Sequence, residues 1–114
     1  MRKVFFGARL FDGEAMIDDA ALVVEDGAIV ALTPVAERPR DARSHDLGGG
    51  VLSPGLIDWQ VNGGGGVLFN AEPTVEAIAA IVAAHRTDGT TALLPTLITD
   101  APQKLEAALA AAAA

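Results

Sequence analysis

Three polar side chains recur at every second position near the middle of the chain: Asp58, Gln60 and Asn62. Because side chains on a β-strand alternate between its two faces, these three share one face and the apolar residues between them share the other. Carboxylate and carboxamide groups on a buried strand need hydrogen-bond partners, since burying an unpaired polar group is costly. Gly63–Gly66 follow directly, and glycine allows the backbone to turn freely and to approach a ligand closely. The stretch Val51–Asn70 is therefore the predicted centre of the chemistry.

The glycine run at residues 63–66 does not match a nucleotide-binding motif. A dinucleotide loop needs G-x-G-x-x-G opening into a helix, and Leu68 stands where its third glycine belongs. Another run, Gly48–Gly50, lacks the G-K-[ST] ending of a phosphate loop and is expected to be a flexible joint. We expect Gly63 and Gly64 to form part of a tight loop shaped for close substrate approach. Phosphate binding by these glycines remains an alternative.

The first 50 residues predict a small antiparallel β module that acts as a scaffold rather than as a ligand-binding sheet. Apolar, β-branched runs bounded by turn signals are typical of strands. Asp26-Gly27 predicts a two-residue hairpin turn of the type that needs positive φ. Pro34 is expected to end a strand, because proline cannot donate a hydrogen bond to a neighbouring strand. The expected strands are Lys3–Phe11, Ala20–Glu25, Ala28–Thr33 and His45–Leu47.

Residues 51–114 predict two strand–helix units. The expected strands are Val51–Asn62 and Thr90–Thr99; the second is uncharged, like a strand covered on both faces, and should break at Pro95. Thr74 is the expected N-cap of the helix between them, and Asp88-Gly89 should end that helix. For a second helix, the sequence predicts a cap at Asp100, a first-turn proline at Pro102 and a buried face marked by Leu105 and Leu109.

Composition excludes several classes of protein. The net charge of −7 argues against a surface for nucleic acid or for an anionic membrane. Cysteine is absent, so the chain has neither disulfides nor thiolate chemistry. No segment approaches the roughly 20 apolar residues of a membrane span, and Arg9 and Asp12 interrupt the first apolar run too early for a signal peptide. We therefore expect a globular, cytoplasmic protein that binds neither nucleic acid nor membrane.

Pro54-Gly55, two apolar residues, Asp58 and two alternating side chains together resemble the first barrel strand of the amidohydrolase superfamily. Most members of that superfamily carry D-x-H-x-H here, whereas this chain has Gln60 and Asn62. This replacement, with NGGGGVLFN after it and LLPTLIT at Leu93–Thr99, is similar to the N-acetylglucosamine-6-phosphate deacetylases. The resemblance covers most of the chain.

The resemblance implies an α/β fold: the start of a (β/α)8 amidohydrolase barrel, preceded by part of a small antiparallel β-sandwich. Residues 1–50 would belong to the β-sandwich, and residues 51–114 would form the first two βα units of the barrel. Because such a barrel takes about 250 residues, the 114 residues are expected to be the N-terminal portion of a longer protein. The final alanine run, which carries no helix-capping signal, agrees with this expectation.

The resemblance also implies hydrolysis of N-acetylglucosamine 6-phosphate to glucosamine 6-phosphate and acetate, by a homodimer. One divalent metal ion, zinc or iron, would polarise the amide and activate water. The resemblance places the metal ligands and a catalytic aspartate further along the barrel, so the 114-residue chain alone is expected to be inactive. Two alternatives remain open: another amidohydrolase, of the cyclic amidase or N-acyl amino acid deacylase type, and a non-catalytic β-rich interaction module.

Gln60, Asn62, Gly63 and Gly64 are the candidate residues for binding the substrate or the reacting water. Carboxamides are weaker ligands for zinc or iron than imidazole, but each can donate and accept hydrogen bonds. We therefore predict hydrogen bonding from Gln60 and Asn62, and no catalytic residue or metal ligand within this chain.

The two histidines are expected to be structural. His45, between Ser44 and Asp46, suits a surface or a sheet edge better than a metal site. His85 falls in the last turn of the first predicted helix, where a charged imidazole is favourable. That turn lies at the amino end of the next strand, whereas barrel chemistry lies at the carboxyl ends of the strands.

Overall fold

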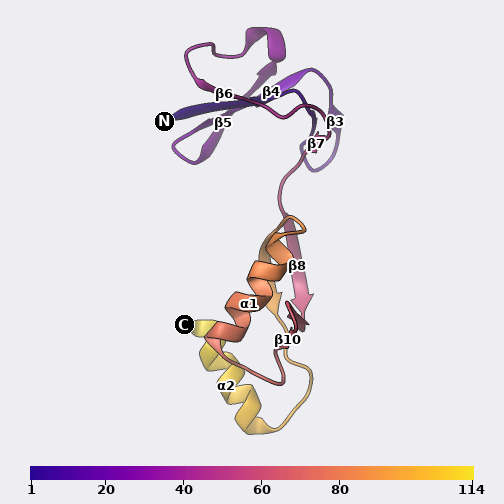
Figure 1. Cartoon of the computed structure of the whole chain (residues 1–114), viewed down its shortest axis with the longest axis vertical. Helices are drawn as coiled ribbons and strands as arrows, with labels where there is room; N and C mark the ends of the chain where they lie inside the picture. Colours follow the sequence, from indigo (N-terminus) through magenta and orange to yellow (C-terminus); the bar gives the residue numbers. More distant parts are fainter. The chain divides into compact units, whose positions relative to one another are not determined.

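The computed structural model describes all 114 residues and divides them into two units, Met1–Pro54 and Gly55–Ala114. Figure 1 shows the strands of the first unit and the helices of the second in chain order. Neither helix is long and apolar enough to cross a membrane.

Two sheets make up the first unit. The larger has the strand order β5-β4-β1-β6, and the smaller has the order β3-β2-β7. Val4, Ala21 and Val23 are buried between the larger sheet and the segments that cover it, and Phe6 and Val35 pack against them. The bounds are β1 (Arg2–Phe6), β2 (Arg9–Phe11), β3 (Met16–Ile17), β4 (Ala20–Glu25), β5 (Ala28–Pro34), the 3-10 helix η1 (Val35–Glu37), β6 (Arg43–Asp46) and β7 (Val51–Leu52).

The predicted hairpin between β4 and β5 is confirmed. Its two turn residues, Asp26 and Gly27, have φ angles of 50° and 87°. Positive φ at both positions gives the turn the twist that matches two antiparallel strands. The strand that follows ends at Pro34, one residue later than predicted.

The predicted single strand Lys3–Phe11 is wrong, because the chain turns at Gly7 and places β1 and β2 in different sheets. Gly7 has a φ of 82°, which L-residues rarely adopt. A Cβ atom at this position would also overlap the carboxylate of Asp46. Gly7 thus ends the strand partly because of Asp46, which is distant from it in the sequence.

The prediction of a purely antiparallel module is also wrong, since both sheets are mixed. Strand β6 runs parallel to β1, and β7 runs parallel to β2. Short hairpins give antiparallel neighbours, whereas a parallel neighbour needs a crossover. Residues 35–42 supply that crossover, because they lead from β5 at one edge of the larger sheet to β6 at the other.

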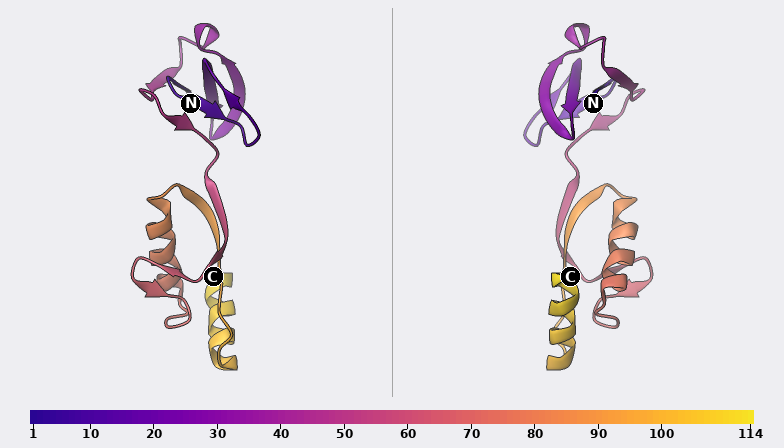
Figure 2. Two further views of the ribbon diagram at one scale, coloured as in Figure 1. Left: turned by 90° about the vertical axis from the view of Figure 1, so that its right-hand side faces the viewer. Right: turned by 90° about the vertical axis from the view of Figure 1, so that its left-hand side faces the viewer.

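The second unit contains a parallel pair of strands, β8 (Leu56–Val61) and β11 (Thr90–Pro95). Helix α1 (Val75–Arg86) connects them and lies along one side of the pair in Figure 2. A small antiparallel hairpin of β9 (Gly63–Gly64) and β10 (Val67–Leu68) precedes α1, and α2 (Pro102–Ala113) ends the chain. The apolar core consists of Val61, Phe69, Ile81 and Ala108.

The predicted strand Val51–Asn62 is two strands. Residues Val51–Leu52 pair with β2 in the first unit, while Leu56–Val61 pair with β11 in the second. The segment Ser53-Pro54-Gly55 separates them, and Pro54 has no N–H with which to continue a ladder. Apolar residues lie on both sides of this break, so the sequence gives no sign that the pairing partner changes from β2 to β11.

Local signals for α1 and β11 are confirmed. The Thr74 Oγ1 accepts a hydrogen bond of 3.1 Å from the Ala77 N–H, as an N-cap should. Gly89 has a φ of 92° after the helix. Strand β11 ends at Pro95, and its register with β8 shifts just before that residue.

Helix α2 differs from its prediction in two ways. Its N-cap residue is Ala101 rather than Asp100, although Pro102 stands in the first turn as predicted. Leu105 and Leu109 are 49% and 63% exposed, so they do not mark a buried face. Ala108 is the buried residue, and the helix packs on the core through this small side chain.

The second unit exposes large apolar side chains, including Trp59 at 81%, Ile57 at 76% and Leu109 at 63%. Exposed apolar surface beside a strand with an open edge favours association. The polypeptide of residues 1–114 expressed alone should therefore aggregate or unfold without a cooperative transition. Size-exclusion chromatography with light scattering and a thermal melt test this expectation. A monodisperse monomer with one sharp transition would contradict it.

Candidate functional site

Asn62 directly follows β8, and the residue that directly follows β11 orients its side chain. The side-chain Nδ2 of Asn62 donates to the Thr96 carbonyl oxygen at 2.9 Å. The backbone carbonyl of Asn62 accepts from the Phe69 N–H at 2.8 Å. A backbone carbonyl only accepts hydrogen bonds, so the contact with Thr96 fixes which end of the carboxamide is nitrogen. Oδ1 of Asn62 is thereby left as an acceptor for the N–H of a substrate or for a water.

Gln60 precedes Asn62 by two residues and is exposed. Val61, between them, is 3% exposed and packs in the core with Ile81. Because strand side chains alternate, Gln60 and the half-buried Asp58 lie on the face opposite Val61, in agreement with the predicted polar face. The Asp58 Oδ1 accepts from the Gln60 backbone N–H at 3.1 Å, so this contact orients the Asp58 carboxylate and does not involve the Gln60 carboxamide.

The glycine run forms the tip and one strand of the β9–β10 hairpin. Gly65 and Gly66 have φ angles of 61° and 82° and make its turn. A Cβ atom on Gly64 would lie 2.9 Å from the ring of His85, and one on Gly65 would lie 3.2 Å from the Ala80 carbonyl oxygen. Close packing against α1 therefore requires glycine at these positions, for a reason that the sequence did not indicate. The ligand-binding role of Gly63 and Gly64 stays a prediction.

Each histidine makes a packing contact or a hydrogen bond within the fold. The ring of His45, on the edge strand β6, stacks on Phe5 with 4.9 Å between ring centroids. His85 is half-buried, and its Nε2 lies 3.0 Å from the carbonyl oxygen of Gly63. The expected structural role of His85 is thus supported, with the glycine hairpin as its partner.

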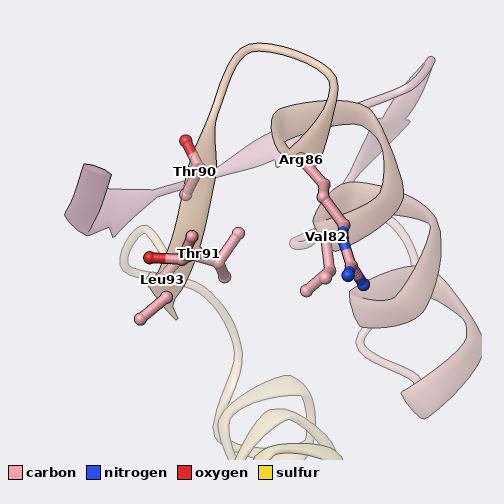
Figure 3. Close-up of a pocket in the computed structure, with 6 residues that line it drawn as sticks. Val82, Arg86, Thr90, Thr91 and Leu93 are labelled. Atoms are coloured by element: carbon pink, nitrogen blue, oxygen red, sulfur yellow. The ribbon is translucent and has the colours of Figure 1, made fainter. Parts of the chain in front are cut away.

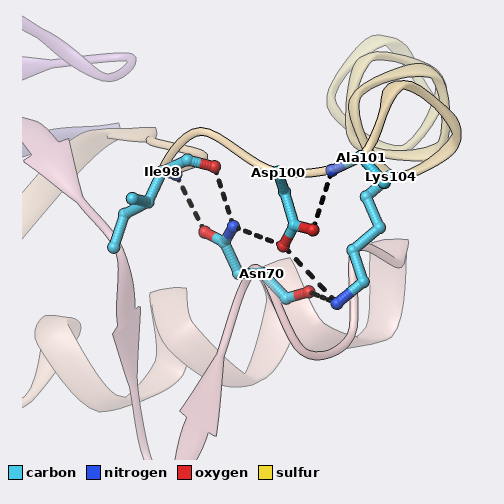
Figure 4. Close-up of polar contacts among 5 residues, drawn as sticks. All are labelled: Asn70, Ile98, Asp100, Ala101 and Lys104. Atoms are coloured by element: carbon cyan, nitrogen blue, oxygen red, sulfur yellow. Dashed lines mark hydrogen bonds and ion pairs between the residues drawn. The ribbon is translucent and has the colours of Figure 1, made fainter.

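Asn70 is the only buried polar residue, at 8% exposure, and it lies at the centre of a network of hydrogen bonds (Figure 4). Its Oδ1 accepts from the Ile98 N–H at 2.8 Å, and its Nδ2 donates to the Ile98 carbonyl at 2.8 Å and to Asp100 at 3.0 Å. Lys104 Nζ donates to the backbone carbonyl of Asn70 at 2.7 Å and lies 3.6 Å from the Asp100 carboxylate. Sequence reasoning missed this network, because its members lie in two loops and the start of α2.

The two loops that Asn70 joins lie at one edge of the β8–β11 pair. Because these strands are parallel, their carboxyl ends meet, and the Thr96 N–H donates to the Val61 carbonyl there at 2.8 Å. Asn62 and Asn70 both bind the segment that follows β11. In α/β barrels this edge carries the active site. The structure therefore places Asn62 at the carboxyl edge of the strand pair and links it to the loop after β11.

Comparison with known proteins finds similarity to deacetylases of amino sugar phosphates along almost the whole chain. Residues 5–52 match the family model described as the NagA composite domain. An N-acetylgalactosamine-6-phosphate deacetylase of Shewanella sp. (strain ANA-3) is 43% identical over 109 residues, which cover 94% of this chain and 28% of the relative. An N-acetylglucosamine-6-phosphate deacetylase of Haemophilus influenzae is 34% identical over 94 residues, covering 82% of this chain and 25% of the relative.

A solved structure agrees with these relatives. The crystal structure of N-acetylglucosamine-6-phosphate deacetylase from Pasteurella multocida superposes with a TM-score of 0.91 at 32% identity, over 97% of this chain and 29% of that chain. The predicted family resemblance is confirmed. The chain spans between a quarter and three tenths of the length of these deacetylases.

The amidohydrolase superfamily implies a divalent metal ion, and the residues of the candidate edge do not suit one. No three histidine, aspartate or glutamate side chains come together in this chain to hold a metal. Asn62 directs its Nδ2 to Thr96, and neutral carboxamides are weak ligands for zinc or iron. We therefore derive no metal-dependent step from Gln60 or Asn62.

A pocket of about 250 Å³ lies between α1 and β11, away from the candidate edge (Figure 3). Val82 and Arg86 of α1 face Thr91 and Leu93 of β11 across it. Thr90, which also lines the pocket, begins β11, so the pocket lies toward the amino end of the strand. In α/β barrels the active site lies at the carboxyl ends of the strands, which is the opposite end, and we assign this pocket no part in the candidate site.

Asp100 should give the network a stability that depends on pH. The pKa of Asp100 lies below its usual value, first because the Asn70 amide donates to it and then because the Ala101 N–H does. A carboxyl with a lowered folded-state pKa stabilises the fold above the unfolded pKa of about 3.9, and this stability is lost as pH falls through the folded pKa. In a protein carrying this chain at its relatives' full length, Asp100→Asn should lower the Tm at neutral pH and matter less below about pH 4. Thermal unfolding across pH measures this, and a pH-independent difference in Tm would contradict it.

Proposed function

We propose that this chain is the N-terminal part of a metal-dependent deacetylase that removes the acetyl group from an N-acetylated amino sugar 6-phosphate. The observation that carries the proposal is the TM-score of 0.91 over 97% of the chain with a deacetylase of known structure. The predicted substrate is N-acetylglucosamine 6-phosphate, and its products would be glucosamine 6-phosphate and acetate.

N-Acetylgalactosamine 6-phosphate is a second candidate substrate. The Shewanella relative named for that sugar is 43% identical to this chain, compared with 34% for the Haemophilus relative named for N-acetylglucosamine 6-phosphate. The two sugars differ only in the configuration at C4. Both share the acetamide that the proposed reaction cleaves, so the reaction class does not depend on the choice.

The proposed architecture follows from the two units. Residues 1–50 would contribute to a β-sandwich, and β8, α1, β11 and α2 would be the first two βα units of a (β/α)8 barrel. The parallel pairing of β8 with β11, with α1 between them in the chain, supports this proposal. The complete protein would form a homodimer, as the family resemblance implies.

Within this architecture, Gln60 and Asn62 would line the mouth of the barrel and orient the substrate or the reacting water. Oδ1 of Asn62 would accept a hydrogen bond, because its Nδ2 donates to Thr96. A zinc or iron ion held by residues outside these 114 would polarise the acetamide carbonyl and activate the water. Gly63 and Gly64 would allow the substrate to come close to the backbone.

The proposal is tested by expressing the complete protein that carries this chain and measuring acetate release from both sugar phosphates. We expect metal-dependent release from at least one of them, with the polypeptide of residues 1–114 alone as the inactive control. N-Acetyl amino acids and cyclic amides serve as comparison substrates for other amidohydrolase activities. A folded, metal-loaded protein that hydrolyses only those comparison substrates, or nothing, would refute the proposed function.

A further inference from the structure

The imidazole of His85 connects the last turn of α1 with the glycine hairpin. Its Nε2 lies 3.0 Å from the Gly63 carbonyl oxygen, and the residue is half-buried. Since a carbonyl oxygen only accepts hydrogen bonds, Nε2 must carry a hydrogen and donate it. Gly63 is the residue after Asn62, so this hydrogen bond fixes the Gly63–Gly64 peptide, one residue beyond Asn62.

The hairpin and the histidine ring are also matched in shape. A Cβ atom on Gly64 would lie 2.9 Å from both Cδ2 and Nε2 of the His85 ring. On Gly65, a Cβ atom would meet the Cβ of Ala84 at 3.3 Å. The absence of side chains at these two glycines therefore lets the hairpin approach α1 closely enough for His85 to reach the backbone.

Asn62 and its neighbour are thus fixed from three directions. The Thr96 carbonyl accepts from the Asn62 side chain at 2.9 Å, and the Phe69 N–H donates to the Asn62 carbonyl at 2.8 Å. His85 adds the third contact, from α1, at the next carbonyl along the chain. Without it, the segment between β8 and the hairpin turn would lose its hydrogen bond to the helix.

We propose that His85 is a positioning residue that acts through the Gly63 carbonyl and orients Asn62 toward the substrate or its water. This inference rests on the proposed deacetylase function, in which Asn62 contacts the substrate. His85 itself touches neither the substrate nor the reacting atoms. Its contribution is to donate one hydrogen bond from Nε2, and a side chain that donates from the same place should replace it.

Two variants of the complete protein separate this role from simple packing. In His85→Gln, the amide nitrogen occupies nearly the position of the imidazole Nε2, whereas the shorter amide of His85→Asn falls short of Gly63. Loss of one positioning hydrogen bond should lower kcat/KM by about tenfold in His85→Asn. His85→Gln should stay within about threefold of the wild type. His45→Gln, in the first unit, is the matched control and should leave kcat/KM unchanged.

A second measurement reports on the contact independently of catalysis. Amide hydrogen exchange at residues 63–69 should be faster in His85→Asn than in the wild type and should return toward wild-type rates in His85→Gln. Wild-type kcat/KM in His85→Asn, or an equal loss in both variants when both are folded, would overturn the inference. A wild-type protein inactive on both sugars refutes the proposed function instead, and unchanged exchange in His85→Asn would then overturn the positioning contact as well.

Discussion

Replacing Gln60 and Asn62 together with alanine should lower kcat/KM for the proposed deacetylase reaction of the complete protein roughly ten- to several-hundred-fold. A hydrogen bond contributes about 0.5–1.5 kcal/mol, and more when one partner is charged. At about 1.4 kcal/mol per factor of ten in rate, two such bonds account for the expected range. Steady-state kinetics with both sugar phosphates measures the loss.

The variants Gln60→Ala and Asn62→Ala, measured separately, show how much each side chain contributes to the loss of kcat/KM. Gln60 is exposed, so Gln60→Ala removes a carboxamide without disturbing the core. Asn62→Ala also removes the donor to the Thr96 carbonyl, which lies 2.9 Å away, and should have the larger effect. If the two variants lose activity equally, the contact between Asn62 and Thr96 does not contribute to catalysis.

Metal content provides the decisive control for the two carboxamides. The double alanine variant should keep about one metal ion per subunit, because neutral carboxamides are weak ligands. Replacing both residues with histidine restores the D-x-H-x-H pattern and should raise metal uptake toward two ions per subunit. Elemental analysis measures both. Loss of metal from the double alanine variant would show that Gln60 and Asn62 are ligands after all.

Replacing Asn70 with leucine, which has a similar volume, should lower the free energy of unfolding by about 1–3 kcal/mol. Asn70 is 8% exposed and makes three side-chain hydrogen bonds, so the variant leaves both backbone groups of Ile98 without their partner. Denaturant unfolding of the complete protein measures the change. Wild-type stability in Asn70→Leu would show that water replaces the lost hydrogen bonds.

Asn70→Asp is the matched variant. It keeps an oxygen that can accept from the Ile98 N–H, but it places a second carboxylate where Nδ2 now lies 3.0 Å from Asp100. Two like charges at that distance repel, so the destabilisation should be greatest at neutral pH and should decrease in acid as the carboxylates take up protons. A destabilisation that does not change with pH would show that repulsion is not its cause.

Features set by neighbours in the sequence were predicted well. The Asp26-Gly27 turn, the Thr74 cap and the break at Pro95 each depend on the conformational preferences of one or two residues. The same holds for the alternation that places Gln60 on the face opposite Val61. Local chemistry is sufficient in these cases because the groups that interact are separated by only a few residues.

Features set by distant partners were not predictable in the same way. Gly7 ends a strand partly because Asp46 occupies the space beside it, and β6 lies parallel to β1 because a crossover carries the chain to the far edge. Asp100 stands one residue before the N-cap of α2, and its carboxylate accepts a hydrogen bond from Asn70, 30 residues earlier. At the candidate site, the sequence indicated Asn62 but not its partner Thr96.

The exposure of Trp59 has a spectroscopic consequence. It is the only tryptophan in these 114 residues, and 81% of its surface is accessible to water. An indole in water emits at longer wavelength than one in an apolar environment. In the proposed barrel, residues that cover this face of β8 would shift the emission of Trp59 to shorter wavelength, so its fluorescence would provide an optical signal for closure of that barrel during refolding.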